Sequence, residues 1–267
     1  MLNPEILSIL CHPHTHEPLQ LAEGKLVAAQ SGDDFPIQAD IPRLLSPRPP
    51  LRHRFWEWVY NRIAFAYDWG VAVAWQWKLG GQPLHRHAYL EKIHLQPGDL
   101  VLETAVGTGA NIEQLPAHAQ YVGLDISHNM LRKCARNLKQ WGRNASLVQA
   151  DAQWLPFFDQ VFDAVYHMGG LQFLADPQQA LAEALRVTRP GGHLWIVDEA
   201  YSISSVVRSF LKQQQVSDKR NFSSQMQGVE ALASLLPASA EDIHAELISN
   251  NELYILSFKK CKDQSPQ

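Results

Sequence analysis

Three acidic residues close or follow three successive apolar runs, and such a set could bind the hydroxyl or amino groups of a ligand. Glu103 closes the run "VLE", Asp125 closes "YVGLD", and Asp151 follows "LVQA". In a parallel sheet built from alternating strands and helices, ligands bind at the carboxyl ends of the strands. We therefore expect the three carboxylates to converge at one edge of a sheet.

A glycine-containing turn follows the first of these acids. In "VLETAVGTG", Gly107 and Gly109 allow a ligand to approach the backbone just before a helix, whose first N–H groups are unpaired. A dinucleotide fingerprint would need a third glycine where Ile112 stands, and Glu103 would repel a pyrophosphate. The turn therefore favours a ligand that carries positive charge.

S-Adenosylmethionine is such a ligand, because it carries an amino group and a sulfonium beside its adenosine. Asp125 lies where α/β nucleotide sites place an acid against the two ribose hydroxyls. Asp151 can accept from the adenine amino group, and Ala152 can donate from its backbone amide. The sequence thus predicts a site for S-adenosylmethionine, with S-adenosylhomocysteine as the product.

The elements that must position these residues alternate along the chain from residue 97. Strands are predicted in "DLVLETA", "AQYVGLDI", "SLVQADAQ", "FDAVYHMGG" and "HLWIVDEA", and helices over 108–116, "SHNMLRKCARNLKQWG" and "PQQALAEALRVTRPGG". This alternation is typical of βαβ units and a parallel sheet. Near the end, "EDIHAELIS" and "NELYILSFKK" predict a closing hairpin around Asn250 and Asn251.

Five motifs resemble those of class I S-adenosylmethionine-dependent methyltransferases in order and spacing: "VLETAVGTG", "VGLDISHNML", "ADAQWLPF", "FDAVYHMGGLQFL" and "EALRVTRPGGHLWIVDE". Within that superfamily, residues 97–260 look nearest to the quinone C-methyltransferases and their small-molecule relatives. The resemblance implies an α/β fold with a Rossmann-like seven-stranded sheet, ordered 3-2-1-4-5-7-6 with strand 7 antiparallel and flanked by helices. Ala105 departs from the glycine that usually opens the turn. The cofactor-binding residues expected on this basis are Tyr67, Glu103, Ala105, Gly107, Gly109, Asp125, Ile126, Asp151, Ala152 and His167.

His167, in "YHMGG" at the end of a predicted strand, is the candidate catalytic base. Methyl transfer is an in-line displacement, and an oxygen or phenolic carbon acceptor must also lose a proton. His85 and His87 are alternative bases, and His167 could instead form a wall of the pocket. Asp198 and Glu199 could orient the acceptor or simply end a strand. The candidate acceptor-binding residues are Trp69, Trp75, His85 and Tyr201.

The residues near these motifs narrow the acceptor. "YHMG" stands where an amino-methyltransferase for adenine or cytosine carries Asn/Asp-Pro-Pro-aromatic. Neither Cys134 nor Cys261 is placed as the nucleophile of cytosine C5 methylation, and three cysteines are too few for arsenic methylation. We expect a small lipophilic or aromatic acceptor, methylated at carbon or oxygen.

The sequence before residue 96 predicts two further pieces. Residues 1–45 predict a small β unit with a turn at Glu23 and Gly24. Residues 46–95 begin with the proline-rich "SPRPPLRHR", a linker, and continue into an aromatic-rich helical segment. That segment either packs as core or forms a lid that lines the acceptor pocket. Residues 96–267 then form the methyltransferase domain.

The β unit resembles small zinc ribbons of the Trm112-like kind, and also the ribbon in front of a ribosomal RNA guanine methyltransferase. Cys11 and His14 occupy one ligand pair, but Ala28 and Ser31 stand in the other. Two ligands cannot close a tetrahedral zinc site. We therefore expect a degenerate ribbon without a metal.

Composition bounds the partners and the location. The chain has 267 residues, a formal net charge of -4 and 46% hydrophobic residues. An acidic balance disfavours nucleic acid, and the few scattered cysteines with no long apolar run predict a cytoplasmic protein without a transmembrane segment. We expect a monomer or homodimer with peripheral contact to a lipophilic acceptor. Two alternatives stay open: an RNA methyltransferase whose ribbon presents RNA, and a non-catalytic binding protein with this fold.

Overall fold

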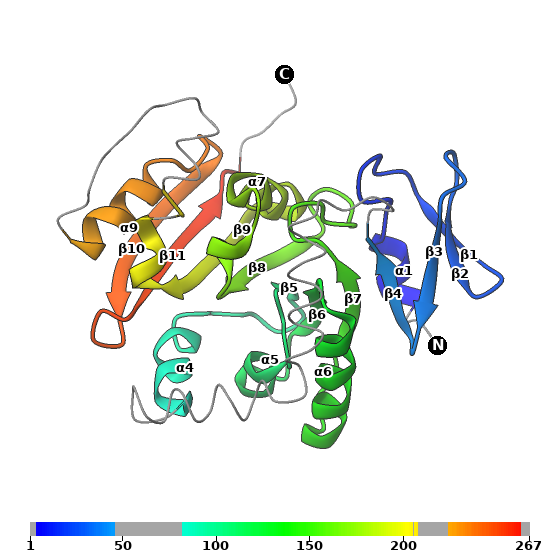
Figure 1. Ribbon diagram of the computed structural model, residues 1–267, viewed down its shortest axis with the longest axis horizontal. Helices are drawn as coiled ribbons and strands as arrows, with labels where there is room; N and C mark the ends of the chain where they lie inside the picture. Colours follow the sequence, from blue (N-terminus) through cyan, green and yellow to red (C-terminus); the bar gives the residue numbers. More distant parts are fainter. Residues whose placement is uncertain (1–3, 46–81, 205, 208–223, 263–267) are drawn as a thin grey trace.

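The computed structural model of the chain describes residues 4–45, 82–204, 206–207 and 224–262 (Figure 1). The strands are β1 (Leu19–Ala22), β2 (Lys25–Ala28), β3 (Asp34–Gln38), β4 (Ile41–Leu44), β5 (Leu100–Thr104), β6 (Gln120–Asp125), β7 (Ser146–Ala150), β8 (Phe162–Met168), β9 (Thr188–Glu199), β10 (Ala240–Ile248) and β11 (Leu253–Lys260). The helices are α1 (Pro4–Ile9), α4 (Gln82–Leu90), α5 (Ala110–Gln114), α6 (His128–Trp141), α7 (Pro177–Val187) and α9 (Gln225–Ala233), with short 3-10 turns η1 (Leu171–Phe173) and η2 (Ala200–Ser202). The predicted α/β alternation is present from β5 onward.

All of these strands belong to one mixed sheet, ordered β1-β2-β3-β4-β7-β6-β5-β8-β9-β11-β10. The expected count of seven is therefore wrong for the sheet as a whole, because β4 pairs in parallel with β7 and adds β1 to β4. Strands β5 to β9 run parallel to one another, while β11 runs antiparallel to both β9 and β10. The carboxyl ends of β5 to β9 consequently share one edge.

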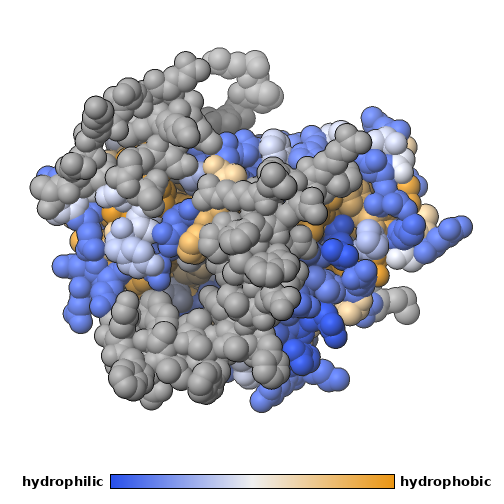
Figure 2. All heavy atoms as spheres, viewed as in Figure 1, coloured by the Kyte–Doolittle hydropathy of each residue, from blue (hydrophilic) through white to orange (hydrophobic). Residues whose placement is uncertain are grey.

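Helices cover both faces of this sheet. In Figure 1, α4, α5 and α6 lie on one side, and α7 and α9 lie on the other. Each side has its own buried apolar cluster, with Leu131 of α6 and Tyr166 of β8 in one, and Leu181 of α7 and Phe162 of β8 in the other. The outer rim of the described surface is mostly hydrophilic, and hydrophobic residues show toward its middle (Figure 2).

Local sequence signals explain where several elements begin and end. The side chain of Ser127 accepts from the N–H of Met130 and caps α6, and Gly142 ends that helix with a left-handed φ of 65°. The hairpin between β10 and β11 turns through Ser249, Asn250 and Asn251, all with positive φ. The predicted hairpin is thus present, and its asparagines fit a left-handed turn.

The domain boundaries predicted at residues 45 and 95 stay predictions. Residues 46–81 lie outside the described residues, and α4 is the described part of the segment 46–95. Within the described ranges, no helix has both the length and the apolar composition to cross a membrane.

Candidate active site

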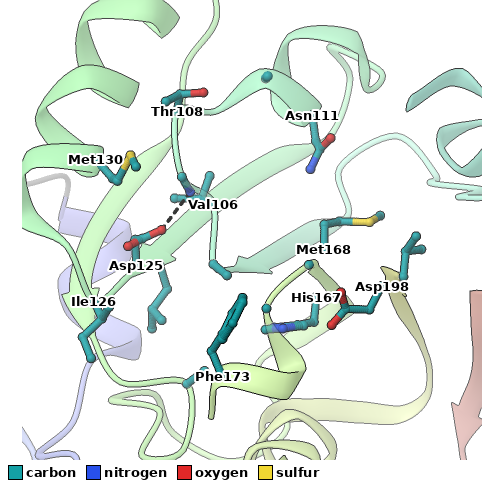
Figure 3. Close-up of a pocket in the computed structure, with 18 of the residues that line it drawn as sticks. Val106, Thr108, Asn111, Asp125, Ile126, Met130, His167, Met168, Phe173 and Asp198 are labelled. Atoms are coloured by element: carbon teal, nitrogen blue, oxygen red, sulfur yellow. Dashed lines mark hydrogen bonds between the residues drawn. The ribbon is translucent and has the colours of Figure 1, made fainter. Parts of the chain in front are cut away.

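A cavity of about 670 Å³ opens at the carboxyl ends of strands β5 to β9. Asp125, Ile126 and Met130 lie at one end of it, and His167 and Asp198 lie toward the other (Figure 3). This is the edge at which parallel α/β sheets bind ligands. The cavity therefore brings together residues that lie far apart in the sequence.

The glycine turn forms part of the cavity wall. Ala105 (φ 62°), Gly107 (φ 54°) and Gly109 (φ 81°) all adopt the left-handed conformation. Ala105 and Gly107 line the cavity, but Gly109 does not. A Cβ at Gly109 would lie 2.7 Å from the Sγ atom of Cys134. Gly109 therefore shapes the turn and lets α5 pack closely on α6, rather than facing a ligand.

Asp125 faces the cavity from the end of β6. Its Oδ2 accepts from the backbone N–H of Gly107 at 2.9 Å, and its Oδ1 from the N–H of Ser127 at 2.8 Å (Figure 3). Burial raises the pKa of this carboxyl to about 6, although its hydrogen bonds lower it. A carboxylate has about four acceptor positions, so capacity remains for the hydroxyls of a ligand. Ile126 lines the same end of the cavity.

Asp151 and Ala152 line the cavity next to the end of β7. The Oδ1 of Asp151 accepts from both the N–H and the Nε2 of Gln153, each at 2.9 Å. The Oε1 of Gln153 accepts from the N–H of Asp176 at 2.6 Å. These bonds hold the loop after β7 in place. Gln153 also lines the cavity, and sequence reasoning missed it because a glutamine after a strand carries no distinctive pattern.

Glu103 is not among the residues that line the cavity, and its expected contact with the cofactor stays a prediction. Its side chain is 0% exposed, and it accepts from Asn111 Nδ2 at 2.6 Å and from Tyr166 OH at 2.8 Å. Burial raises the pKa of Glu103 to about 7, and these two hydrogen bonds oppose the rise. Asn111 of α5, which donates to Glu103, does line the cavity.

Asn111 and two residues of α4 were not predicted. Arg86 Nη1 and Tyr89 OH each donate to Asn111 Oδ1 at 3.0 Å, and all three residues line the cavity. The guanidinium of Arg86 brings positive charge to the part of the cavity wall that contains Asn111. The available signal was that Arg86 and Tyr89 stand three residues apart and so share one helix face.

His167 lines the cavity, and only one of its two ring nitrogens has a hydrogen-bond partner among the described residues. Its Nδ1 lies 2.9 Å from the Oγ1 of Thr104, while its buried Nε2 has no hydrogen-bond partner in the part of the chain that the structure describes. Burial lowers the pKa of His167 to about 4. The imidazole is therefore neutral at neutral pH, and its low pKa makes it a weak proton acceptor.

Asp198 and Glu199 also line the cavity, at the end of β9. The Oδ2 of Asp198 accepts from the N–H of Leu171 at 2.9 Å, and burial raises the pKa of Asp198 to about 6. Tyr201, an expected acceptor-binding residue, is 71% exposed and does not line the cavity. It donates its hydroxyl to Glu199 instead. The expected contact of Tyr201 with an acceptor is therefore not supported.

Four of the residues that line the cavity are apolar residues from the β8 end onward: Met168, Phe173, Leu174 and Leu253. Figure 3 shows the ring of Phe173 on one side of His167, and Met168 and the carboxylate of Asp198 near its other side. Burial against such a wall favours an apolar ligand by about 25 cal/mol per Å² of apolar surface. This end of the cavity thus suits a lipophilic molecule.

Several predicted site residues cannot be placed. Tyr67, Trp69 and Trp75 lie outside the described residues, and His85 lies on α4 with a side chain outside them. His87, the other alternative base, is exposed, and its Nδ1 lies 2.6 Å from a carboxylate oxygen of Glu91 on the same helix. The structure therefore gives His87 no role in the cavity.

Side-chain hydrogen bonds stabilise the N-terminal β unit, for which a degenerate zinc ribbon was expected. The Nε2 of His12 lies 3.1 Å from Asp33 Oδ2, and its Nδ1 accepts from the N–H groups of His14 and Thr15. Burial raises the pKa of the Cys11 thiol to about 12. Among the described residues, no three His, Cys, Asp or Glu side chains gather as a metal site. The absence of zinc stays a prediction.

The polar groups around the cavity fit S-adenosylmethionine. Asp125 has spare acceptor capacity for ribose hydroxyls, and Arg86 with Asn111 offers partners for an amino-acid carboxylate and amino group. Ile126 and Met130 supply apolar contacts beside Asp125 (Figure 3). At the other end, the Nε2 of His167 is buried and has no hydrogen-bond partner among the described residues.

The fold and this site can be compared with those of known proteins. Residues 102–196 match the family described as "Methyltransferase domain". A demethylmenaquinone methyltransferase of Thermobifida fusca (strain YX) is 39% identical over 142 residues, which cover 52% of this chain and 59% of that protein. One of Corynebacterium urealyticum is 39% identical over 120 residues, covering 45% and 50%. The chain spans between half and about six tenths of the length of these two curated relatives.

A solved structure shows the same fold. One chain of the complex between the Haloferax volcanii Trm112 methyltransferase activator and its methyltransferase aligns with a TM-score of 0.52 and 18% identity. The alignment covers 81% of this chain and 100% of that one. At this level of identity the similarity establishes the fold alone.

Proposed function

We propose that the protein transfers a methyl group from S-adenosylmethionine to a small lipophilic acceptor of the quinone class, with S-adenosylhomocysteine as the second product. The observation that carries this proposal is one cavity with an acid for ribose at one end and a neutral histidine within an apolar wall at the other. Similarity to demethylmenaquinone methyltransferases supports the choice of acceptor class.

In this proposal the cofactor supplies an electrophilic methyl carbon on a sulfonium. Asp125 accepts from the two ribose hydroxyls, and Asp151 with the Ala152 amide binds the adenine. Arg86 and Asn111 bind the amino-acid end of the ligand. Ala105 and Gly107 provide a wall that a ligand can approach closely. These residues orient the methyl carbon toward the apolar end of the cavity, where alignment and exclusion of water supply most of the rate.

His167 acts on the acceptor in this proposal. The Oγ1 of Thr104 lies within hydrogen-bond distance of both Nδ1 of His167 and the carbonyl oxygen of Tyr166. If the hydroxyl donates to that carbonyl, Nδ1 carries the proton and Nε2 is an acceptor. In that state, His167 Nε2 takes the proton from a hydroxyl group of the substrate that is methylated, while negative charge develops on the aromatic ring of that substrate. Because its pKa is about 4, we expect no loss of activity from protonation of His167 until the pH falls toward 4.

The first test is a titration of the protein with S-adenosylhomocysteine and S-adenosylmethionine by calorimetry. Asp125→Ala should weaken binding by roughly 1–3 kcal/mol through the lost charge-assisted hydrogen bonds. Asp34→Ala is the matched control, because Asp34 is exposed and its described ion pair is with Lys25 on the neighbouring strand. Unchanged affinity of Asp125→Ala would contradict the assigned cofactor site.

The second test is mass spectrometry of reactions with demethylated hydroquinones and other hydroxylated aromatics. A product heavier by the mass of one methylene group would support the proposed methyl transfer. Cofactor binding without any product would favour the non-catalytic alternative. His167→Ala should slow transfer by about 10²–10⁴-fold if His167 is the base. The exposed His244→Ala is the matched control, and near-wild-type turnover of His167→Ala would reassign His167 to the pocket wall.

A further inference from the structure

We propose that the N-terminal unit, residues 4–45, sets the affinity for the cofactor by holding the two loops that bind its nucleoside. These are the β6 loop (residues 125–127) and the β7 loop (residues 151–158). The inference rests on the proposed cofactor site. None of the described residues of the N-terminal unit lines the cavity, so the unit acts through other residues and its side chains are positioning residues.

The first connection runs from β4 to the β6 loop. Arg43 pairs with Gln149 in the sheet, and Gln149 pairs with Asp125 on its other side, so the three residues lie in one row across β4, β7 and β6. Arg43 Nε donates to Gln149 Oε1 at 2.6 Å, and Gln149 Nε2 donates to the carbonyl oxygen of Ile126 at 2.9 Å. Gln149 is 0% exposed. Arg43 thus orients the amide that fixes the residue after Asp125.

The second connection runs from the segment after α1 to the β7 loop. The N–H of Cys11 donates to the carbonyl oxygen of Pro156 at 3.0 Å, and the N–H of Phe158 donates to that of Ile9 at 3.1 Å. Between them, Leu10 and Phe157 form an antiparallel bridge, and both side chains are fully or almost fully buried. The far half of the β7 loop is therefore paired with the N-terminal unit as a short ladder.

A ring contact reaches further toward the cavity. The ring of His14 lies 4.8 Å, centroid to centroid, from the ring of Trp154. The backbone N–H of Trp154 donates to the carbonyl oxygen of Asp151 at 2.9 Å, and Trp154 directly follows Gln153 in the sequence. His14 thus contacts the half of the β7 loop that carries the predicted adenine contacts.

The other side of the β7 loop is tied to α7. The N–H of Leu155 donates to Glu183 Oε2 at 2.8 Å, and Arg186 donates to the carbonyl oxygens of Leu155 and Phe157. The loop therefore lies between two supports. Loss of one support leaves the fold in place but lets the loop sample other conformations. A ligand must then order the loop when it binds, which weakens its affinity.

The test uses the full chain and compares Arg43→Met and His14→Ala with the wild type. We expect each variant to bind S-adenosylhomocysteine and free adenosine about 5- to 20-fold more weakly, because one side-chain contact that orders a loop is lost. Arg43→Lys, which retains a donor, should recover part of the affinity. In turnover assays KM for S-adenosylmethionine should rise while kcat at saturation stays within about twofold, because the bound geometry is restored once the ligand is in place.

Two control variants separate positioning from stability. Lys25→Ala removes an exposed ion pair with Asp34 inside the N-terminal unit, and Arg189→Met removes an exposed ion pair with Asp163. Both should keep the wild-type affinity. A wild-type dissociation constant in Arg43→Met and His14→Ala would overturn the positioning role, as would equal weakening in Lys25→Ala. A wild-type protein that binds no S-adenosylhomocysteine would overturn the proposed function itself.

Discussion

Replacement of Glu103 by glutamine should change how the stability of the protein depends on pH. The Glu103 side chain is fully buried, and burial raises its pKa from 4.5 to about 7. Below pH 4.5 the carboxyl is protonated in both the folded and the unfolded state. As pH rises from about 4.5 to about 7, the unfolded state loses this proton first, so the folded state loses stability. A rise of this size corresponds to on the order of 3 kcal/mol.

The assay is urea unfolding followed by tryptophan fluorescence at a series of pH values between about 4.5 and about 8. Relative to Glu103→Gln, the wild type should lose on the order of 3 kcal/mol of unfolding free energy across this range. All other buried titratable groups are shared by both proteins, so their contributions cancel in the difference. Glu230→Gln, which makes the same change at an exposed position on α9, is the matched control. A difference between wild type and Glu103→Gln that does not change with pH would refute the reasoning.

The packing predicts the effects of four substitutions. Gly142→Ala should lower the unfolding free energy by about 1 kcal/mol, because alanine is strained at the left-handed φ of this position. Gly109→Ala should lower it by roughly 1–3 kcal/mol more, because its Cβ would also lie 2.7 Å from Cys134 Sγ, and equal losses for the two variants in chemical denaturation would contradict this. Tyr254→Phe should raise the unfolding free energy by about 1 kcal/mol, because its buried hydroxyl has no partner among the described residues. Tyr166→Phe, which removes a hydrogen bond to Glu103, should lower it by roughly 1–3 kcal/mol. Elemental analysis of protein purified without a histidine tag should find no stoichiometric zinc, and one zinc per chain would show that the ribbon still binds metal.

The sequence allowed prediction of strands β5 to β11 and helices α5 to α7, because each has a local signal, but it did not predict α9. Alternating apolar runs marked the strands, and Ser127 and Gly142 bound α6 as its caps. The pairing of β4 with β7 has no such signal, since it joins residues 43–44 to residues 149–150. A short strand such as β4 can pair with many partners, and only packing in three dimensions selects one. The sequence therefore predicts a β unit over residues 1–45 but not its addition to the main sheet.

In the candidate site, too, some features could be predicted from the sequence and others could not. Asp125, Asp151 and His167 stand at strand ends, where the parallel sheet fixes their position, and all three line the cavity. Glu103 also stands near a strand end, but the side chain points to Tyr166 and Asn111 inside the molecule. Whether the side chain of a strand residue reaches the cavity depends on the register of the strand and on which side chains the neighbouring helix places beside it. The assigned ligand roles, the cytoplasmic location and the oligomeric state stay predictions.

The pairing of β4 with β7 also has a consequence for how copies of the chain meet. Without β4, the backbone N–H and C=O groups along one side of β7 would be open to a strand from another molecule. The outer strands of the sheet are instead β1, which has four residues, and β10, whose pairing is interrupted between Glu241 and His244. Short and irregular outer strands disfavour strand addition and aggregation. The N-terminal unit thus also helps to keep the sheet from growing between molecules.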